Sequence, residues 1–338
     1  MATPLTYDLV VGIDIAAATA TVVELPHDGT PSRPHTIAQT PAGHAAYLQH
    51  LGTLGLSFAR ILVVMEATGS YWITLATTLA QAGLAVSVIN PAQAHDFAKA
   101  LLKRSKTDAI DAQTLARLGA LLLPACWTPP PAIYHELQQR LVHRDALLDL
   151  RQQVRNQLHA LVQQPTVIAS VRTRLETLNT SLTEQIVAVD AELATAVQLD
   201  EAWAATLARL QTITGIGLLT AAWLVVTTLN FTVSRDAAQA AGYAGLVPRQ
   251  HQSGSSVRGR PRLDHAGNSR LRRALYMATL SAARRNPVVQ PFYARLRAAG
   301  KPMKVARCAA ARKLLTIAWA VATKQQDFAV PLASQPQP

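Results

Sequence analysis

Two aspartates three residues apart are the side chains of this 338-residue chain best suited to metal chemistry. Asp108 and Asp111 stand at the start of an expected helix over residues 108–122. Residues three apart lie on one face of a helix, so both carboxylates point the same way. Two like charges side by side repel, and a divalent cation between them would relieve that repulsion. The spacing therefore predicts a metal site at the beginning of this helix.

Two further acids follow apolar stretches that have the composition of buried strands. Asp14 ends the stretch at residues 9–13, and Glu66 ends the stretch at residues 61–65. The ends of central strands reach the surface of a domain, where catalytic groups commonly lie. Mg²⁺ takes oxygen ligands and only one or two carboxylates per ion, so four converging acids suit a pair of ions and phosphoryl transfer. We predict a catalytic site with Mg²⁺, or Mn²⁺ as the alternative, at four metal ligands: Asp14, Glu66, Asp108 and Asp111.

The elements that must position these acids alternate between strands and helices. Expected strands are a hairpin over residues 9–25 and the stretches 35–39, 61–65 and 85–89. Expected helices are 41–51, 70–82, one that begins at Pro91, and 108–122. Three antiparallel strands followed by β/α units predict an α/β domain of the RNase H-like kind, a fold of many two-metal nucleases.

The remainder of the chain has mostly helical patterns. After a proline-rich linker at residues 124–131, apolar residues at helical spacing predict two long helices, paired as a hairpin or used in a coiled-coil-like manner to join subunits. A Gly-Ile-Gly turn at residues 215–217 opens a further helix, either as a phosphate contact or as a plain turn. We expect four regions: an RNase H-like domain at 1–125, a helical linker or oligomerisation segment at 126–203, a basic, mostly helical domain at 204–326, and a disordered tail at 327–338.

The positive charge of the chain is concentrated near its C-terminal end. Residues 248–324 contain seventeen Lys and Arg and one acid, Asp264, so this segment is more positive than the +12 of the whole chain. Such a one-sided basic segment attracts the phosphate backbone of a nucleic acid. The predicted nucleic-acid-binding residues lie there and just before Asp108: Lys103, Arg104, Lys106, Arg258, Arg260, Arg262, Arg270, Arg272 and Arg273.

Composition argues against a membrane or secreted protein. The apolar stretches 218–229 and 314–322 are shorter than the roughly 20 residues that cross a bilayer, and the first residues do not resemble an export signal. Cys126 and Cys308 are isolated and suggest neither a disulfide framework nor a cysteine metal site. We expect a cytoplasmic protein with no membrane partner.

A serine-rich segment lies beside three arginines in the basic region. Ser253, Ser255 and Ser256 precede Arg258, and arginines there are suited to neutralising a phosphate. A serine acts as a nucleophile only when it is activated, and no His or Asp at fixed spacing identifies a base. Chemistry alone therefore favours a serine-rich linker.

Six motifs occur in order between about residues 9 and 324. They are Gly12-Ile13-Asp14, Glu66-Ala67-Thr68-Gly69, Val88-Ile89-Asn90-Pro91, Lys106-Thr107-Asp108-x-x-Asp111-Ala112, Gly215-Ile216-Gly217 and Ser253-Gly254-Ser255-Ser256-Val257-Arg258-Gly259. This ordered set resembles the DEDD transposases of the insertion-sequence one-ten family. One departure is that many members have Lys shortly after the first Asp, where this chain has Ala17 and Ala18.

The resemblance implies a mechanism that the residues alone do not. It implies a RuvC-like domain whose four acids bind Mg²⁺, and a C-terminal domain with Ser253 as the nucleophile, Ser255 and Ser256 remaining alternatives. It also implies a recombinase guided by a structured non-coding bridge RNA that pairs with both donor and target double-stranded DNA. Members act as tetramers, dimers of dimers, in which the acids of one subunit and the serine of another form a composite site.

Three other functions are compatible with parts of the pattern. A Holliday-junction-type endonuclease would use the acids with water and form no covalent intermediate. An actin-like ATPase also opens with Gly-Ile-Asp, but a second Asp-containing phosphate loop and an adenosine site are not found in the sequence. A non-catalytic nucleic-acid-binding protein would use only the basic segment.

Overall fold

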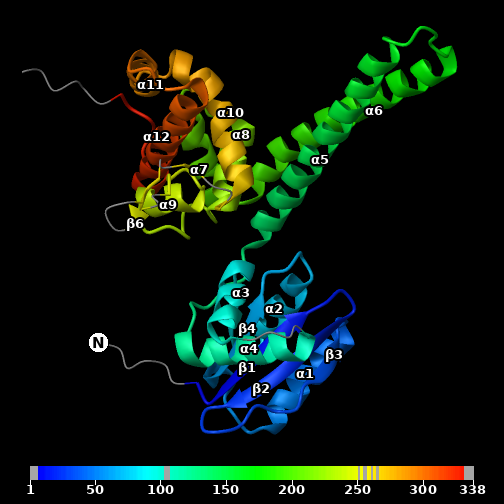
Figure 1. The fold of residues 1–338 in the computed structure, drawn as a ribbon, viewed down its shortest axis with the longest axis vertical. Coiled ribbons are helices and arrows are strands. Elements are labelled where there is room, and N and C mark those ends of the chain that lie inside the picture. The colour runs from blue at the N-terminus through cyan, green and yellow to red at the C-terminus, as the bar shows by residue number, and fades with distance from the viewer. Residues whose placement is uncertain are drawn as a thin grey trace, which may run out of the picture. The chain divides into compact units, whose positions relative to one another are not determined.

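The structure is a computed structural model that describes residues 7–102, 107–249, 252–253, 257–259, 262–263 and 266–330. For residues 252–253 and 257–258 it describes the backbone alone. The chain forms two compact units, Met1–Pro129 and Pro130–Pro338. Figure 1 draws both units as a ribbon.

The first unit is built on a five-stranded mixed sheet. The strands are β1 (Leu9–Ile15), β2 (Thr19–Pro26), β3 (His35–Ala38), β4 (Ile61–Glu66) and β5 (Ala85–Ile89). Their spatial order is β3-β2-β1-β4-β5, with β1 antiparallel to β2, β2 antiparallel to β3, and β4 parallel to both β1 and β5. The predicted strands and the hairpin are confirmed.

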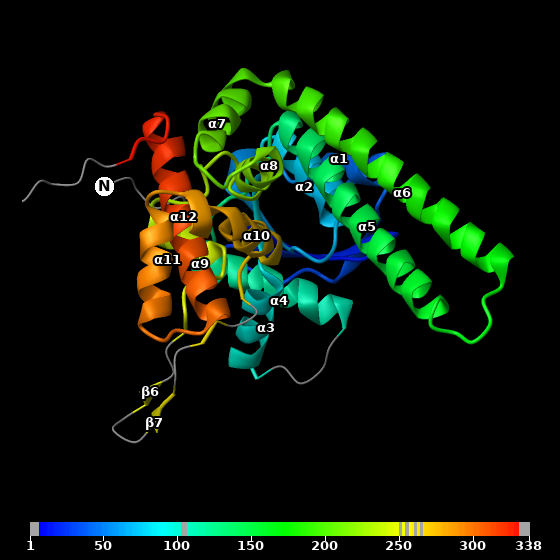
Figure 2. The same cartoon turned by 90° about the horizontal axis from the view of Figure 1, so that it is seen from above.

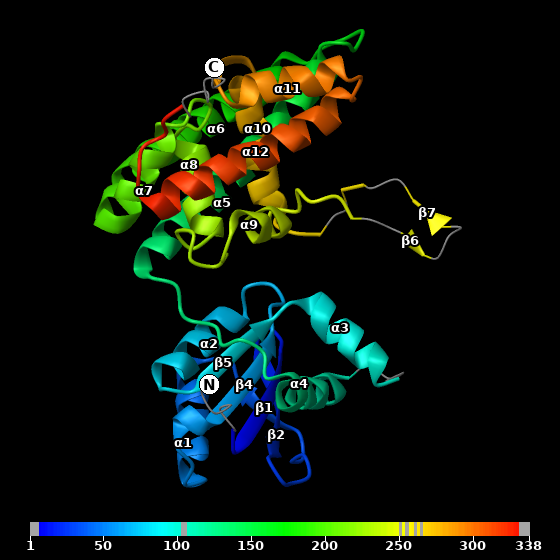
Figure 3. The same cartoon turned by 90° about the vertical axis from the view of Figure 1, so that its left-hand side faces the viewer.

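Helices cover both faces of this sheet. Helices α1 (Pro41–Thr53) and α2 (Trp72–Gln81) pack on one face, and α3 (Pro91–Ala100) and α4 (Asp108–Leu122) pack on the other (Figure 3). Successive residues of a strand point to opposite faces, so Val11 joins the core under α1 and α2 while Val10 joins the core under α4. A short 3₁₀ helix, η1 (Phe58–Arg60), precedes β4.

Local capping residues explain where the helices of this face begin. Thr107 caps α4, because its hydroxyl accepts a hydrogen bond of 3.3 Å from the backbone N–H of Ile110. Asn90 caps α3 in the same way, and Pro91 occupies its first turn as predicted. The predicted helix at 108–122 is confirmed, whereas α2 begins two residues later than the predicted start at Ser70.

The second unit begins with two long paired helices. Helices α5 (Ala132–Leu161) and α6 (Ala169–Ala196) run side by side and form the predicted hairpin within one chain (Figure 2). Their apolar stripes are buried against each other, with Leu141 and Leu193 fully inaccessible to solvent. An ion pair between Arg144 and Asp190 also joins the two helices.

The remaining elements are mostly helical. They are η2 (Val197–Leu199), α7 (Glu201–Gln211), α8 (Leu218–Thr227), α9 (Ala237–Tyr243), the short hairpin β6 (Gln252–Ser253) and β7 (Val257–Arg258), α10 (Ser269–Arg285), α11 (Val289–Ala298) and α12 (Met303–Lys324). One apolar core is shared by α5, α6 and the later helices, so the long hairpin belongs to the same compact unit as the C-terminal helices.

Two further predictions were a disordered tail at residues 327–338 and a chain without a membrane-spanning helix. Residues 327–330 lie in no helix or strand, and the rest of the predicted tail, 331–338, lies outside the described residues. Among the helices that the structure describes, none combines the length and the apolar character needed to cross a membrane.

Candidate active site

Asp14 is the centre of a group of acids in the first unit. Its carboxyl group is half-buried, and its pKa is raised to about 6. Burial is the largest cause, followed by the negative charges of Asp111, Asp108 and Glu66 in that order. The three other predicted acids are therefore close enough to act electrostatically on Asp14, although they come from two other elements.

Neighbouring parallel strands bring the first two acids together. Asp14 follows Ile13 on β1, and Glu66 follows Met65 on β4, and Ile13 and Met65 are paired residues of the two strands. The Thr68 hydroxyl donates a hydrogen bond of 2.7 Å to Oε1 of Glu66 and so orients that carboxylate. The sequence analysis did not predict that Thr68 orients Glu66, and the only signal for this role was its position two residues after Glu66.

The other two acids belong to the first turn of α4. Asp108 is exposed and Asp111 is half-buried. Backbone N–H groups at a helix N-terminus favour nearby negative charge, which stabilises both carboxylates there. The backbone of α4 also packs against Gly12 of β1: a Cβ at residue 12 would overlap the Ala112 carbonyl oxygen and the Ala116 nitrogen. This contact places the first turn of α4 beside the end of β1.

The donor atoms of this carboxylate site suit a hard divalent cation. All four side chains offer oxygen, the atom that Mg²⁺ and Mn²⁺ prefer, and Asp14 already experiences three negative neighbours. In the described part of the chain, three potential ligand atoms lie within 4.8 Å of one another only at Glu24, His35 and His50. Among the four carboxylates, no three oxygens from different residues lie that close together.

The serine segment has a hairpin backbone. In the antiparallel β6–β7 pair, Ser253 is opposite Val257 and Gln252 is opposite Arg258. Arg262 and Arg249 form a backbone bridge next to this hairpin. The predicted nucleic-acid contacts Lys103, Arg104, Lys106 and Arg260 lie outside the described residues.

The three predicted arginines of α10 have different surroundings. Arg270 lies 5.5 Å from the centre of the Trp223 ring, and Arg273 pairs with Asp149 of α5 at 3.6 Å across an exposed surface. Arg272 instead donates hydrogen bonds to the carbonyl oxygens of Ala244 and Ala266. Arg272 thus has a structural role, because its hydrogen bonds connect the end of α9 to the segment that precedes α10.

The Gly-Ile-Gly turn has a packing explanation. Gly215 has a φ of +105°, and a Cβ there would lie 2.7 Å from the Cβ of Ala282 in α10. Buried Asn286 donates a hydrogen bond of 3.0 Å to the Thr214 carbonyl oxygen and fastens the same turn. These contacts account for Gly215 through helix packing, and they favour the plain turn over the phosphate contact.

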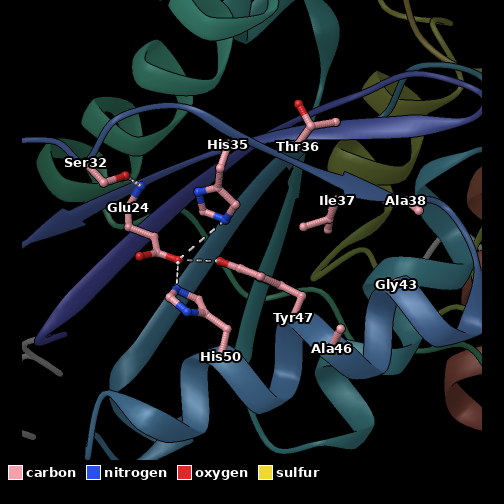
Figure 4. Close-up of a pocket in the computed structure, with 10 residues that line it drawn as sticks. All are labelled: Glu24, Ser32, His35, Thr36, Ile37, Ala38, Gly43, Ala46, Tyr47 and His50. Carbon is pink, nitrogen blue, oxygen red and sulfur yellow. Dashed lines mark hydrogen bonds and ion pairs between the residues drawn. The ribbon is translucent and has the colours of Figure 1, made fainter.

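A second polar cluster lies between β2, β3 and α1, and sequence reasoning missed it. Figure 4 shows Glu24, His35, Tyr47 and His50 pointing toward one another in a pocket. Burial and the neighbouring Glu24 charge raise the pKa of Tyr47 well above its usual value. One signal was available: Glu24 is an acid on the face of β2 whose other residues, Ala20, Val22 and Pro26, are apolar.

Comparisons with known proteins match two parts of the chain to transposase families. A family model described as a DEDD transposase matches residues 11–166, and a model described as the transposase IS116/IS110/IS902 family matches residues 207–294. The first match covers Asp14, Glu66, Asp108 and Asp111, and the second begins within α7 and ends within α11.

Three curated relatives extend over most of the chain. The pilin gene-inverting proteins of Moraxella lacunata and Moraxella bovis are each 32% identical over 79% of this chain and 81% of their own length. The transposase for insertion sequence element IS1328 from Yersinia enterocolitica is 30% identical over 79% of this chain and 85% of its own. The chain therefore belongs to the IS110 family of transposases, as its motifs predicted, and it is an enzyme that acts on DNA.

Proposed function

We propose that this protein is an RNA-guided DNA recombinase that mobilises an insertion sequence by metal-dependent strand cleavage and exchange. The observation that carries the proposal is the effect of Asp111, Asp108 and Glu66 on the pKa of Asp14. Charges act in this way only on nearby groups, so the effect supports a single site formed by acids of β1, β4 and α4. The strand order β3-β2-β1-β4-β5, with three antiparallel strands followed by parallel ones, supports an RNase H-like frame for that site.

The four acids are proposed as the metal ligands. Asp14, Glu66, Asp108 and Asp111 would hold Mg²⁺ or Mn²⁺, which when bound would orient a scissile phosphate and neutralise its developing charge. The hydrogen bond from the Thr68 hydroxyl would hold the Glu66 carboxylate in a fixed orientation for metal binding. Asp108 and Asp111 stand in the first turn of α4, where the backbone N–H groups of the helix N-terminus favour a bound anion such as the scissile phosphate.

Ser253 is proposed as the nucleophile, with Ser255 and Ser256 as the alternatives. Its oxygen would form a bond to phosphorus and lose its proton, while the bond from phosphorus to the departing strand breaks and that strand leaves with a hydroxyl end. The phosphoserine so formed retains the energy of the broken bond, and attack by a new strand end would release the serine. This reversibility suits strand exchange better than hydrolysis.

Nucleic acids are the proposed partners. The net charge of residues 248–324 suits donor and target DNA, and the family resemblance supports a structured guide RNA. Relatives named for inversion of a pilin gene support strand exchange over simple cleavage.

The proposed assembly is a dimer of dimers. On α6, Val171 is 40% and Leu178 46% exposed in the single chain, and their spacing of two helical turns places both on one face. Apolar side chains on an exposed helix face are typical of surfaces that join subunits. A second copy would cover them and allow the acids of one subunit to act with the serine of another.

The covalent step can be tested by trapping. Wild-type protein, guide RNA and end-labelled donor and target DNA should yield a protein–DNA adduct that survives denaturing electrophoresis. Ser253→Ala should abolish the adduct and the exchange products, whereas Asp14→Asn should abolish cleavage altogether. Metal-dependent cleavage without an adduct, unchanged in Ser253→Ala, would instead identify an endonuclease of the Holliday-junction type that uses water.

A further inference from the structure

The cluster of Glu24, His35 and His50 has the donor atoms of a metal site and lies on the opposite face of the sheet from Asp14. Glu24 is paired with Val11 and Asp14 is paired with Thr21 in the β1–β2 register. Paired residues of antiparallel strands share a face and successive residues alternate, so Glu24 and Asp14 point to opposite faces. The Glu24 cluster is therefore separate from the carboxylate site, with β1 and β2 between them.

The donor atoms of the cluster converge on one carboxylate oxygen. Oε1 of Glu24 lies 3.1 Å from Nε2 of His50 and 4.0 Å from Nε2 of His35. A tetrahedral zinc site with bonds of about 2.0–2.1 Å has ligand atoms roughly 3.3 Å apart. These two separations lie on either side of that value, and the ligand atoms of His35 and His50 lie within 4.8 Å of each other.

The surroundings provide the features that accompany bound zinc. The Tyr47 hydroxyl donates a hydrogen bond of 3.2 Å to Oε1 of Glu24, and hydrogen bonds of this kind orient a ligating carboxylate. The Glu24 side chain is only 12% exposed, which fixes its position, while that of His50 is 45% exposed and faces an open pocket of about 480 Å³. The pocket gives an ion a path to the cluster and leaves room for a water as fourth ligand.

We propose that Glu24, His35 and His50 bind a Zn²⁺ ion that joins strands β2 and β3 to helix α1. Two imidazoles and one carboxylate are a common ligand set for zinc and a poor one for Mg²⁺, which prefers oxygen. Each ligand comes from a different element, so the ion would tie the edge of the sheet to the helix that covers it. The site serves the fold of the first unit and needs no change in the chemistry at Asp14.

Zinc content and the Co²⁺ spectrum of the full-length protein test this proposal. After incubation with Zn²⁺ and dialysis, wild type should retain one equivalent, and Co²⁺ should give the intense visible bands of four-coordinate nitrogen and oxygen ligation. His35→Gln and His50→Gln should lose affinity by more than the ~10- to 100-fold expected for Tyr47→Phe, which removes only an outer hydrogen bond. Zn²⁺ should also raise the Tm of wild type.

Two matched variants separate this site from other zinc-binding groups. His159→Gln changes an exposed histidine near the end of α5 and should bind Zn²⁺ as wild type does. Asp14→Asn should also keep the zinc equivalent, because Asp14 lies on the other face of the sheet. A wild-type protein that retains no zinc, or gives only the weak Co²⁺ bands of six-coordinate oxygen ligation, overturns the proposal even where a histidine variant fails to fold. Equal zinc affinity in His35→Gln, His50→Gln and wild type overturns it as well.

Discussion

Gly12 of β1 lies against the backbone of Ala112 in α4, so closely that a side chain at residue 12 would overlap the Ala112 carbonyl oxygen. Asp14 is two residues beyond Gly12, and Asp111 directly precedes Ala112. The contact therefore sets the distance between the carboxylates of a strand and a helix that are far apart in sequence. A hydrogen atom as side chain is what allows the two acids to share one site.

Gly12→Ala is expected to damage both stability and catalysis. The added methyl group must push α4 away from β1, which typically lowers the free energy of unfolding by about 1–3 kcal/mol and moves Asp108 and Asp111 away from Asp14. Gly52→Ala is the matched control: nothing lies within 4 Å of its Cβ position in α1, so stability should rise by about 0.5–1 kcal/mol. Chemical denaturation and the trapping assay measure the two effects. Normal activity in Gly12→Ala would show that this contact does not position the site.

Asp14→Asn is expected to abolish cleavage and yet stabilise the protein when a chelator is present. The pKa of Asp14 is about 6 in the folded state and about 3.9 in an unfolded chain, so the folded state holds the proton more tightly. Wild-type stability should therefore fall as pH rises from about 4 to 6, and the penalty should persist above pH 6. Asn carries no charge and avoids the penalty.

The difference between Asp14→Asn and wild type should depend on pH. At pH 8 the variant should be more stable by roughly 1 kcal/mol, a value reduced for solvent screening of this half-buried group, and at pH 4 the two should be equal. Urea denaturation at the two pH values measures this. A variant less stable than wild type at pH 8 would mean that Asp14 contributes to folding rather than to function.

Most elements around the carboxylate site were predictable because local patterns specify them. Strands β4 and β5 and helix α4 have apolar stretches and capping residues that indicate their limits within a residue or two. The grouping of the acids followed from strand ends and helix spacing. The cluster of Glu24, His35 and His50 could not be predicted in this way. It depends on how β2 and β3 pair and on how α1 packs on the sheet, and no local sequence pattern encodes these contacts.

The α10 arginines show the same limit in the second unit. Arg272 and Arg273 are adjacent in a basic segment and were predicted to play the same role, yet only Arg272 bonds to two backbone carbonyls. The charge pattern of a sequence indicates the kind of partner. Tertiary contacts decide which arginines form hydrogen bonds within the protein and which remain available to that partner.

Arg272→Gln and Arg273→Gln should consequently have different effects. Arg272→Gln should lower the free energy of unfolding by about 1.5–3 kcal/mol, the usual contribution of hydrogen bonds from a charged group. Arg273→Gln should change stability by less than about 0.5 kcal/mol, and should reduce the salt dependence of DNA binding by about 0.9 in the log–log slope, because one fewer phosphate is neutralised. Thermal melts and binding titrations at several salt concentrations check both. Arg174→Gln on exposed α6 is the control, and an equal decrease of slope there would remove the special role of Arg273.

Thr68→Val is expected to reduce cleavage while the fold is kept. Valine has nearly the shape of threonine but cannot donate the 2.7 Å hydrogen bond to Glu66, so that carboxylate loses its fixed orientation. Metal affinity should fall ~10- to 100-fold, so the activity should recover at high Mg²⁺. Thr68→Ser keeps the hydroxyl and should behave as wild type. If Thr68→Val has a normal Mg²⁺ dependence, the hydroxyl does not position Glu66.

Direct measurement of Mn²⁺ binding tests whether Asp14, Glu66, Asp108 and Asp111 form one metal site. The resonance of free Mn²⁺ is lost on binding, and the titration should use a His50→Gln background so that the Glu24 cluster does not contribute. Binding should be saturable in this background and should disappear when either Asp14→Asn or Asp111→Asn is added. Binding that persists unchanged in either variant would contradict a single site formed by the four acids.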